Sequence, residues 1–385
     1  MKAVGIICEY NPFHRGHEYL INKAKESGDA VVAVMSGNYT QRGELAIADK
    51  YVRAEAAVKC GADLVLELPF PYSMASAEFF ARGGVSVLAG VGASAVCFGS
   101  ESGDIELIKR AAEAARSEAF ARERERMAST EGSASGYFEA LGRLLGEDTA
   151  LLSNDILAVE YTKAIMGQGL DISPIAVKRI GDGFRDENIS SEIASATAIR
   201  RLISEGGDFA ALLPSASFNT LMEAVEKGEA PVDVKNIEAA VLAFWRSAEP
   251  SALSDFAELG DGLEYRIHDA ALSSVTLSEL EEKSATKKYT AAKIRRAILF
   301  AMVGVTMSDL DRDPEYTSVL AANKKGRELL AQARRREGIR IVTKAADAPK
   351  CRQQELSARA DALYTLAMPK AQGAGYLSTK KIYIE

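Results

Sequence analysis

Short apolar runs alternate with amphipathic segments along the first quarter of the chain. Each run ends at a glycine, a proline or a polar turn, which is typical of a buried strand. The predicted strands cover residues 3–8, 30–36, 63–68 and 95–98. The segments between them have helical spacing, at 18–25, 46–59 and 75–89. Apolar strands that alternate with helices predict an α/β fold, with a parallel sheet covered on both faces.

The pattern changes after this region. A long charged helix is predicted over 105–127, a flexible loop over 129–136, a helix over 153–165 and a strand over 172–178. From about residue 209 helical patterns dominate, at 219–227, 235–246, 276–283, 291–302 and 357–366. Two short runs, 319–321 and 340–342, are predicted as strands of a small terminal α/β piece. We therefore predict a nucleotide-binding domain over 1–208 and a mainly helical domain over 209–385.

Composition narrows the class of protein. The chain is 47% hydrophobic and 26% charged, as in ordinary globular proteins. It has no apolar stretch of the roughly 18 residues that a membrane helix needs, and no signal-peptide pattern at its N-terminus. The four cysteines form no CxxC pair, and three of them lie in apolar contexts that predict reduced core residues, so no metal ligands are assigned. We expect a cytoplasmic protein without a membrane partner.

Charge is unevenly distributed. The whole chain carries −7, yet residues 285–344 contain fourteen Lys or Arg against six Asp or Glu, a local balance of +8. This asymmetry favours a polyanion-binding face on the second domain. The alternative is a set of solvated helix faces.

The most informative residues follow the first predicted strand. The chain has three histidines, and two of them, His14 and His17, form a His-x-Gly-His pattern near the start of the next helix. Backbone N–H groups and the helix dipole favour an anion there, typically a phosphate, and Gly16 lets it approach the backbone. Imidazole N–H groups can also stabilise charge on a leaving phosphate. A histidine near a helix start is often only a cap, but the pair indicates nucleotide chemistry.

Two further polar segments follow predicted strands, at 36–43 and 99–101. Ligands of parallel α/β sheets bind beyond the carboxyl ends of the strands, so these segments are expected near the histidines. The chain has no GxxxxGK[ST] loop, and residues 90–92 lack the third glycine of a dinucleotide fingerprint. The commonest nucleotide folds are thereby excluded.

A late motif completes the pattern. Ser195, Thr197 and Arg200 match a Ser-x-Thr-x-x-Arg spacing, with Ala196 where a second serine is usual. Together with the histidine pair, they resemble the paired signature of the HxGH nucleotidyltransferase superfamily. Longer blocks resemble the bacterial tRNA(Met) cytidine acetate ligases: residues 9–14 (EYNPFH), 35–43 (MSGNYTQRG), 98–101 (FGSE), 195–200 (SATAIR), 262–266 (GLEYR) and 286–290 (TKKYT).

The resemblance implies a Rossmann-like nucleotidyltransferase domain with a parallel sheet, followed by a helical domain that binds tRNA. It implies an ATP-dependent ligase that activates acetate as acetyl-adenylate and releases pyrophosphate. The acetyl group would then pass to N4 of the wobble cytidine of elongator tRNA(Met), giving N4-acetylcytidine and AMP. Mg²⁺ is expected with ATP, held mostly by the phosphates. Two alternatives stay open: a small-molecule adenylyltransferase of the same superfamily, and a non-catalytic RNA-binding protein on this fold.

The catalytic residues implied are His14, His17, Thr197 and Arg200. The histidines are assigned to the triphosphate. Arg200 is assigned to the departing pyrophosphate, where a planar guanidinium binds better than an amine. An ordinary surface arginine is the alternative for Arg200.

The resemblance also implies a nucleotide loop and three further ATP contacts. The loop comprises Ile7, Cys8, Glu9, Tyr10, Asn11, Pro12, Phe13, His14, Arg15, Gly16, His17, Glu18, Tyr19 and Leu20. The further contacts are Gly99, Asn154 and Arg179. From local pattern alone these three could be a strand end, a helix N-cap and an edge charge.

The basic segment supplies candidate tRNA contacts, because RNA binding needs cations for phosphates and often an aromatic ring for a base. Arg42 is a candidate near the acetate or the RNA. The segment 324–336 adds further charge through Lys324, Lys325, Arg327 and 334–336. The main cluster comprises Lys287, Lys288, Tyr289, Lys293, Arg295 and Arg296.

Overall fold

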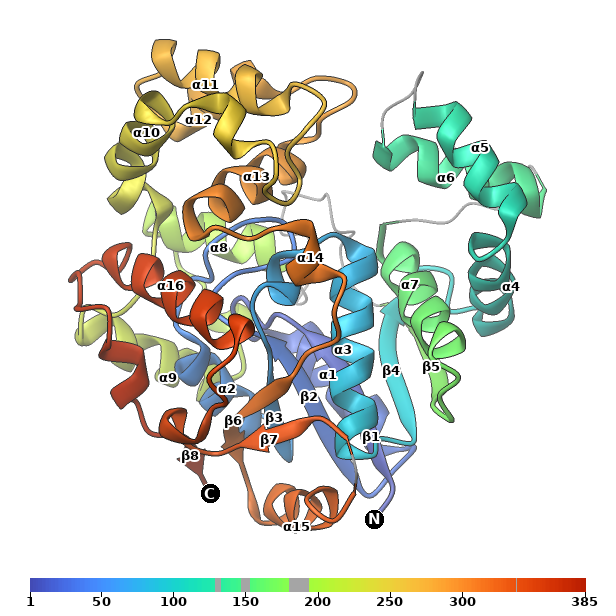
Figure 1. Cartoon of the computed structure of the whole chain (residues 1–385). Helices are drawn as coiled ribbons and strands as arrows, with labels where there is room; N and C mark the ends of the chain where they lie inside the picture. Colours follow the sequence, from blue (N-terminus) through green and yellow to red (C-terminus); the bar gives the residue numbers. More distant parts are fainter. Residues whose placement is uncertain (129–132, 147–152, 180–193, 337) are drawn as a thin grey trace.

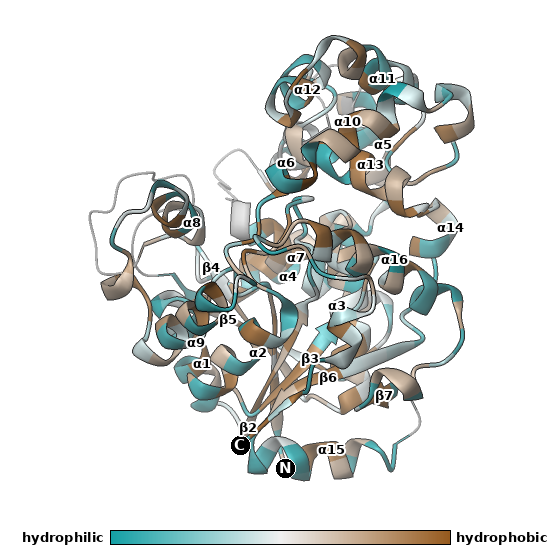
Figure 2. Cartoon of the chain, turned by 90° about the vertical axis from the view of Figure 1, so that its left-hand side faces the viewer, coloured by the Kyte–Doolittle hydropathy of each residue, from teal (hydrophilic) through white to brown (hydrophobic). Residues whose placement is uncertain are grey.

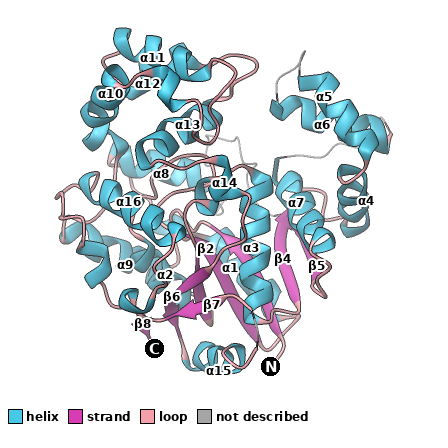
Figure 3. Ribbon diagram, in the orientation of Figure 1, coloured by secondary structure: helices cyan, strands magenta, loops and turns pink. Residues whose placement is uncertain are grey.

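The computed structural model describes residues 1–128, 133–146, 153–179, 194–336 and 338–385. Its core is a mixed sheet in the strand order β5-β4-β1-β2-β3-β6-β7, with β8 beside β6 (Figures 1 and 3). Among the described residues the strands are β1 (Ala3–Cys8), β2 (Ala30–Ser36), β3 (Leu64–Leu68), β4 (Ala95–Ser100), β5 (Ser173–Lys178), β6 (Tyr316–Ala322), β7 (Arg340–Val342) and β8 (Tyr383–Ile384). The α/β class predicted from the sequence is confirmed.

Strands β1 to β5 run parallel to one another. Successive residues of β2 belong to different cores: Val32 and Val34 to one cluster, Val31 and Ala33 to another. This alternation follows from the pleat, which points neighbouring side chains to opposite faces. Both faces are covered, and most residues of the central strands β1 and β2 are accordingly apolar; much of the sheet is brown in Figure 2.

The helices near the sheet are α1 (Arg15–Lys25), α2 (Lys50–Lys59), α3 (Ala77–Val91), α4 (Ile105–Ala115), α7 (Ser153–Gly167), α9 (Ser215–Glu226) and α15 (Lys324–Ala333). Helices α1 and α2 share one core with the sheet, and α3, α4 and α7 share the other. The remaining helices are α5 (Glu118–Ala128), α6 (Ser133–Leu145), α8 (Ala196–Glu205), α10 (Glu238–Ser247), α11 (Leu263–Ser273), α12 (Leu277–Ser284), α13 (Ala291–Val303), α14 (Met307–Leu310) and α16 (Arg352–Leu366).

The C-terminal strands do not form a separate piece, contrary to the prediction. Strand β6 pairs antiparallel with β3, and β7 and β8 pair with β6. Val319 and Ala322 of β6 share a hydrophobic core with the N-terminal strands. The sheet therefore contains strands from both sides of the predicted boundary at 208/209. A single-sequence pattern cannot reveal this pairing, because it reports a strand but not its partner.

The predicted helix over 105–127 and the predicted loop over 129–136 differ from the structure. The predicted long helix over 105–127 is two helices, α4 and α5, because the Ser117 hydroxyl accepts a hydrogen bond from the Phe120 N–H and starts a new helix. The predicted loop over 129–136 overlaps α6, which begins at Ser133. Residues 129–132 lie outside the described part. Among the described residues, no helix is long and apolar enough to cross a bilayer.

Helices α10 to α13 and α16 form a helical layer around the buried Trp245. This layer is built onto the loop between β2 and α2, since Tyr39 and Leu45 of that loop belong to its core. The loop is also tied to α16: the Tyr39 hydroxyl donates to the Ala360 carbonyl at 2.6 Å, and the Asn38 amide donates to Asp361 at 2.7 Å. The helical layer therefore lies over the carboxyl ends of the strands (Figure 1).

Candidate active site

The loop after β1 carries both histidines. Helix α1 begins at Arg15, three residues before the predicted start, because the histidines themselves cap it. The His14 Nδ1 accepts a hydrogen bond from the Gly16 N–H at 3.0 Å, and the His17 Nδ1 accepts one from the His14 N–H at 3.2 Å. A neutral imidazole with Nδ1 as acceptor carries its proton on Nε2. Capping therefore leaves each ring with an Nε2–H donor.

Both imidazoles are held neutral. Burial, with smaller contributions from the charges of Arg179 and Arg200, lowers the pKa of His14 to about 3. Burial also lowers the pKa of His17 well below its ordinary value, with contributions from His14 and Arg179. The two rings stack with their centroids 3.7 Å apart. At neutral pH the pair therefore offers hydrogen-bond donors that add no charge to the site.

Aromatic side chains fix the orientation of His17. Its ring centroid lies 4.8 Å from that of Tyr10 and 5.6 Å from that of Phe13. Tyr10 and Phe13 are buried, and their rings contact each other edge to face. These two residues of the predicted nucleotide loop thus hold the histidine in place.

Arg200 joins this loop from a distant part of the chain. Its Nη1 donates to the Asn11 carbonyl at 2.9 Å, and its Nη2 contacts a Glu44 carboxylate oxygen at 3.1 Å. The Nη2 also lies 3.4 Å from the Thr197 hydroxyl, one turn earlier on α8. Ser195 caps α8 through its hydroxyl, which accepts from the Ala198 N–H at 3.2 Å. The late motif and the histidine loop are therefore together, as the sequence predicted.

Asn11 has an unpaired donor at this junction. Its Oδ1 accepts from the Ile47 N–H at 2.7 Å, whereas its buried Nδ2 has no partner among the described residues. The side chain is 2% exposed. Leaving a buried N–H without an acceptor costs free energy. An acceptor-rich ligand such as a nucleotide would satisfy it.

Gly99 and Arg179 lie side by side at the ends of β4 and β5. The Arg179 N–H donates to the Ser100 carbonyl at 3.0 Å, and a Cβ on Gly99 would lie 3.3 Å from the Arg179 Cγ. The glycine therefore lets the arginine side chain lie close to the end of β4. Because Arg179 lowers the pKa of both histidines, these two predicted contacts belong to the same region.

Asn154 belongs to α7, but its side chain lies outside the described part of the structure. Its neighbour Asp155, which the sequence analysis did not single out, is fully buried. Asp155 accepts hydrogen bonds from the Ser100 hydroxyl at 2.5 Å and the Ser102 hydroxyl at 3.3 Å. It thereby fixes the turn after β4. In the sequence, only the run of polar residues at 153–155 pointed to a role for Asp155.

Several residues of the predicted nucleotide loop have structural contacts. Ile7 packs closely against Gly84 of α3, and the Cys8 thiol donates to the Val34 carbonyl at 3.7 Å. Leu20 packs against the core shared by α1 and α2. Arg15 is exposed, and its Nε donates to the Ala211 carbonyl at 2.8 Å. Contact of these four residues with ATP stays a prediction.

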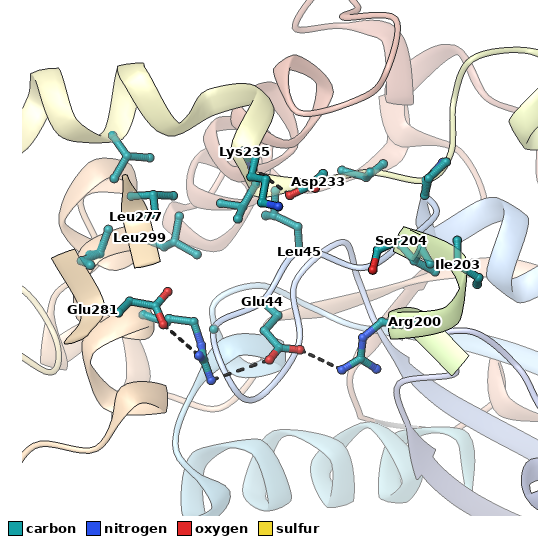
Figure 4. A pocket seen from close by; sticks show the side chains of 18 of the residues that line it. Glu44, Leu45, Arg200, Ile203, Ser204, Asp233, Lys235, Leu277, Glu281 and Leu299 are labelled. Atoms are coloured by element: carbon teal, nitrogen blue, oxygen red, sulfur yellow. Dashed lines mark hydrogen bonds and ion pairs between the residues drawn. The ribbon is translucent and has the colours of Figure 1, made fainter. Parts of the chain in front are cut away.

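Glu44 is the main functional candidate that the sequence analysis missed. Its carboxylate lies between two arginines, 3.1 Å from Arg200 and 3.6 Å from Arg295. Arg295 in turn pairs with Glu281 at 3.0 Å. Figure 4 shows this row of ion pairs along one side of a pocket of about 610 Å³. The block MSGNYTQRG ends just before Glu44, so the sequence indicated that this segment matters. It did not indicate that Glu44 pairs with Arg200 and Arg295.

Only some residues of the predicted tRNA-binding cluster are exposed to solvent. Lys287 and Lys288 are exposed on the segment before α13. Tyr289, by contrast, is 7% exposed, and its hydroxyl donates to the Asp261 carbonyl at 3.1 Å. Arg296 is 8% exposed and pairs with Glu258 at 2.6 Å. These two side chains are occupied within the helical layer, which a sequence pattern of alternating basic and aromatic residues could not show.

Lys293 and Arg295, the other two members, are half-buried. The Lys293 amine lies 5.5 Å from the centre of the Tyr289 ring. Arg42, predicted near the acetate or the RNA, is exposed, and its carbonyl accepts from the Arg295 Nε at 3.1 Å. The loop after β2 is thus connected directly to α13.

The second group of basic residues lies elsewhere. Helix α15 carries Lys324 and Lys325. Its N-cap, Asn323, donates its N–H to the carbonyl of Asp63, the residue just before β3. It therefore lies at the amino ends of the parallel strands, at the bottom of Figure 1 and away from the histidine loop. The charge excess predicted as a single face is divided between two ends of the molecule.

This geometry agrees with comparisons with known proteins. The family model for the HIGH Nucleotidyl Transferase matches residues 1–377. The chain is 35% identical to a "tRNA(Met) cytidine acetate ligase" of Acetivibrio thermocellus, over 100% of both chains. It is also 35% identical to a protein of the same name from Limosilactobacillus reuteri, over 97% of both chains.

Two solved structures are similar along the whole chain. The apo form I crystal structure of Thermotoga maritima TmcAL has a TM-score of 0.92 and 32% identity, with 100% of both chains covered. The form bound with alpha-thio ATP has a TM-score of 0.89 and 31% identity at the same coverage. The fold and the paired motifs thus define a nucleotidyltransferase of the HIGH class. Within that class, the chain belongs to the family of the tRNA(Met) cytidine acetate ligases.

The hydrogen bonds and burial of His14 and His17 predict their protonation behaviour. Because burial lowers both pKa values, the rings should stay neutral, with the proton on Nε2, from pH 8 down to pH 5. NMR spectra of the free protein labelled at its three histidines should show two imidazoles that do not titrate over this range. A His268→Gln variant assigns the third signal. A transition of either site histidine near its ordinary pKa would contradict this expectation.

Proposed function

We propose that this protein is an ATP-dependent ligase that acetylates N4 of the wobble cytidine of elongator tRNA(Met). The observation that carries the proposal is the convergence of His14, His17 and Arg200 on the loop after β1. The names of the relatives support the choice of acetate and tRNA(Met) as substrates. The Thermotoga structure with alpha-thio ATP supports ATP as the nucleotide.

The first half-reaction joins acetate to the α-phosphate of ATP and releases pyrophosphate. Catalysis of such a step depends mainly on positioning and on stabilising the developing charge. The Nε2–H groups of His14 and His17 and the N–H groups at the start of α1 would donate to the triphosphate. Arg200 would exchange its pairing with Glu44 for the leaving pyrophosphate, with Thr197 beside it.

In the second half-reaction the cytidine amine attacks the acetyl carbonyl, and AMP leaves. The exposed Lys287 and Lys288, with Lys293, would bind the RNA backbone above the strand ends, and Arg295 would also contact the RNA. Mg²⁺ would accompany ATP and be held by its phosphates. Among the described residues, no three His, Cys, Asp or Glu side chains form a metal cluster. A cytoplasmic location is part of the same proposal.

The proposal predicts a specific product. The purified protein, incubated with ATP, acetate and an unmodified tRNA(Met) transcript, should yield N4-acetylcytidine by nucleoside mass spectrometry. Omitting any one component should abolish the signal. His17→Ala removes one donor to the triphosphate and should lower the rate by about 10²–10³-fold. If ATP is cleaved to AMP and pyrophosphate with acetate but the RNA is not acetylated, the acceptor is wrong. A phosphorylated small-molecule acceptor would indicate an adenylyltransferase instead.

The exposed lysines before α13 predict a separable effect. Reversing the charge at Lys287 and Lys288 should weaken tRNA acetylation, while acetate-dependent ATP–pyrophosphate exchange continues unchanged. Each lost phosphate contact should reduce the salt dependence of tRNA binding by about one in log–log slope. The matched control reverses Lys324 and Lys325 on α15, at the opposite end of the strands, and should leave tRNA acetylation intact. Equal loss in both variants, or loss of both activities in the first, would argue against this surface.

A further inference from the structure

Among the described residues, the pocket beside Arg200 is lined by no other residue assigned to ATP. It lies between α8 and the helical layer, and its volume of about 610 Å³ falls within the range of small-molecule sites. One end is lined by Ile203 and Ser204 of α8, and the other by Leu277 and Leu299 of the helical layer (Figure 4). A pyrimidine nucleoside is smaller than this space.

The pocket adjoins both halves of the proposed site. Ile47 and Arg200 line it, and both donate to Asn11 of the histidine loop. At the other end it is lined by Arg295, which belongs to the proposed tRNA surface. A group bound here would therefore lie between the ATP phosphates and the RNA backbone.

The walls and the polar edge of the pocket differ in chemistry. Aliphatic side chains such as Leu45, Val234, Leu277 and Leu299 offer surfaces against which a planar base can pack. Along one side, the Glu44 carboxylate and the Arg295 guanidinium lie 3.6 Å apart. A carboxylate accepts hydrogen bonds and a guanidinium donates them, so this edge presents an acceptor next to donors.

Cytosine fits this order. The Watson–Crick edge of cytosine carries the N4 amine as donor, followed by N3 and O2 as acceptors. Carboxylates accept from cytosine N4, and arginine binds paired acceptors. Uracil has a carbonyl oxygen in place of the amine, which would face the carboxylate and be repelled.

We propose that this pocket binds the acceptor cytosine, with Glu44 accepting from N4–H and Arg295 donating to N3 and O2. In the free protein, Glu44 and Arg295 are paired with Arg200 and Glu281 as well as with each other, so neither charge is left uncompensated. When the triphosphate engages Arg200, Glu44 becomes available to the base. ATP binding would thereby prepare the pocket for the RNA. The inference rests on the proposed function and names the site of its second substrate.

A bulky substitution tests the site. Val234→Trp and Leu277→Trp each place a large side chain in the lining and reduce the pocket volume. Each should lower kcat/KM for acetylation of the tRNA anticodon stem-loop by about 10–200-fold, the range for a group that a pocket cannot accommodate. Acetate-dependent ATP–pyrophosphate exchange should be unchanged, which also shows that the variant is folded. Ala243→Trp, on an exposed face of α10, is the matched control.

Discrimination between cytosine and uracil tests the polar edge formed by Glu44 and Arg295. A stem-loop with uridine at the wobble position should compete with the cytidine stem-loop at least about tenfold less well against the wild type. Arg295→Leu should reduce this preference.

The outcomes distinguish a failure of the proposed function from a failure of the pocket assignment. If the wild type does not acetylate the cytidine stem-loop, the proposed function fails. If it does, and both tryptophan variants match Ala243→Trp, only the pocket assignment is overturned. A change in exchange activity with longer carboxylates such as butyrate would assign the pocket to the acyl group and would also overturn the inference.

Discussion

The hydrogen bond from Arg200 to the Asn11 carbonyl spans 189 residues of sequence and closes the candidate site. The same asparagine accepts from the Ile47 N–H through its side chain. The loop after β1, the loop after β2 and helix α8 are therefore joined at a single residue. Their motifs can act together only because a parallel sheet brings its strand ends to one edge.

Capping and phosphate binding are compatible roles for the histidines. Each imidazole uses Nδ1 to satisfy a backbone N–H at the start of α1, which fixes its tautomer. The same bond determines which nitrogen remains as a donor. A local structural role thus prepares the ring for its proposed chemical role, and burial keeps it neutral. Positive charge at the site is supplied instead by Arg179 and Arg200.

The local features of the chain were predictable from its sequence. Strands β1 and β2 have the predicted bounds, because apolar runs between turns determine them. The pairing of β6 with β3, the burial of Arg296 and Tyr289, and the ion pairs of Glu44 were not predictable, because each depends on a partner far away in the sequence. Asp155 was missed for the same reason: its partner Ser100 lies 55 residues earlier. The histidine pair and Arg200 could be linked only through the resemblance to a known family.

The assignment of His14, His17 and Arg200 to one triphosphate site underlies the proposed reaction. It is tested most directly by a crystal structure of this protein with a non-hydrolysable ATP analogue. The Nε2 atoms of both histidines and the Arg200 guanidinium should lie about 2.7–3.2 Å from phosphate oxygens. The Arg200–Glu44 pair should be broken or lengthened. A nucleotide bound away from the loop after β1, with Arg200 still paired only with Glu44, Thr197 and Asn11, would contradict it.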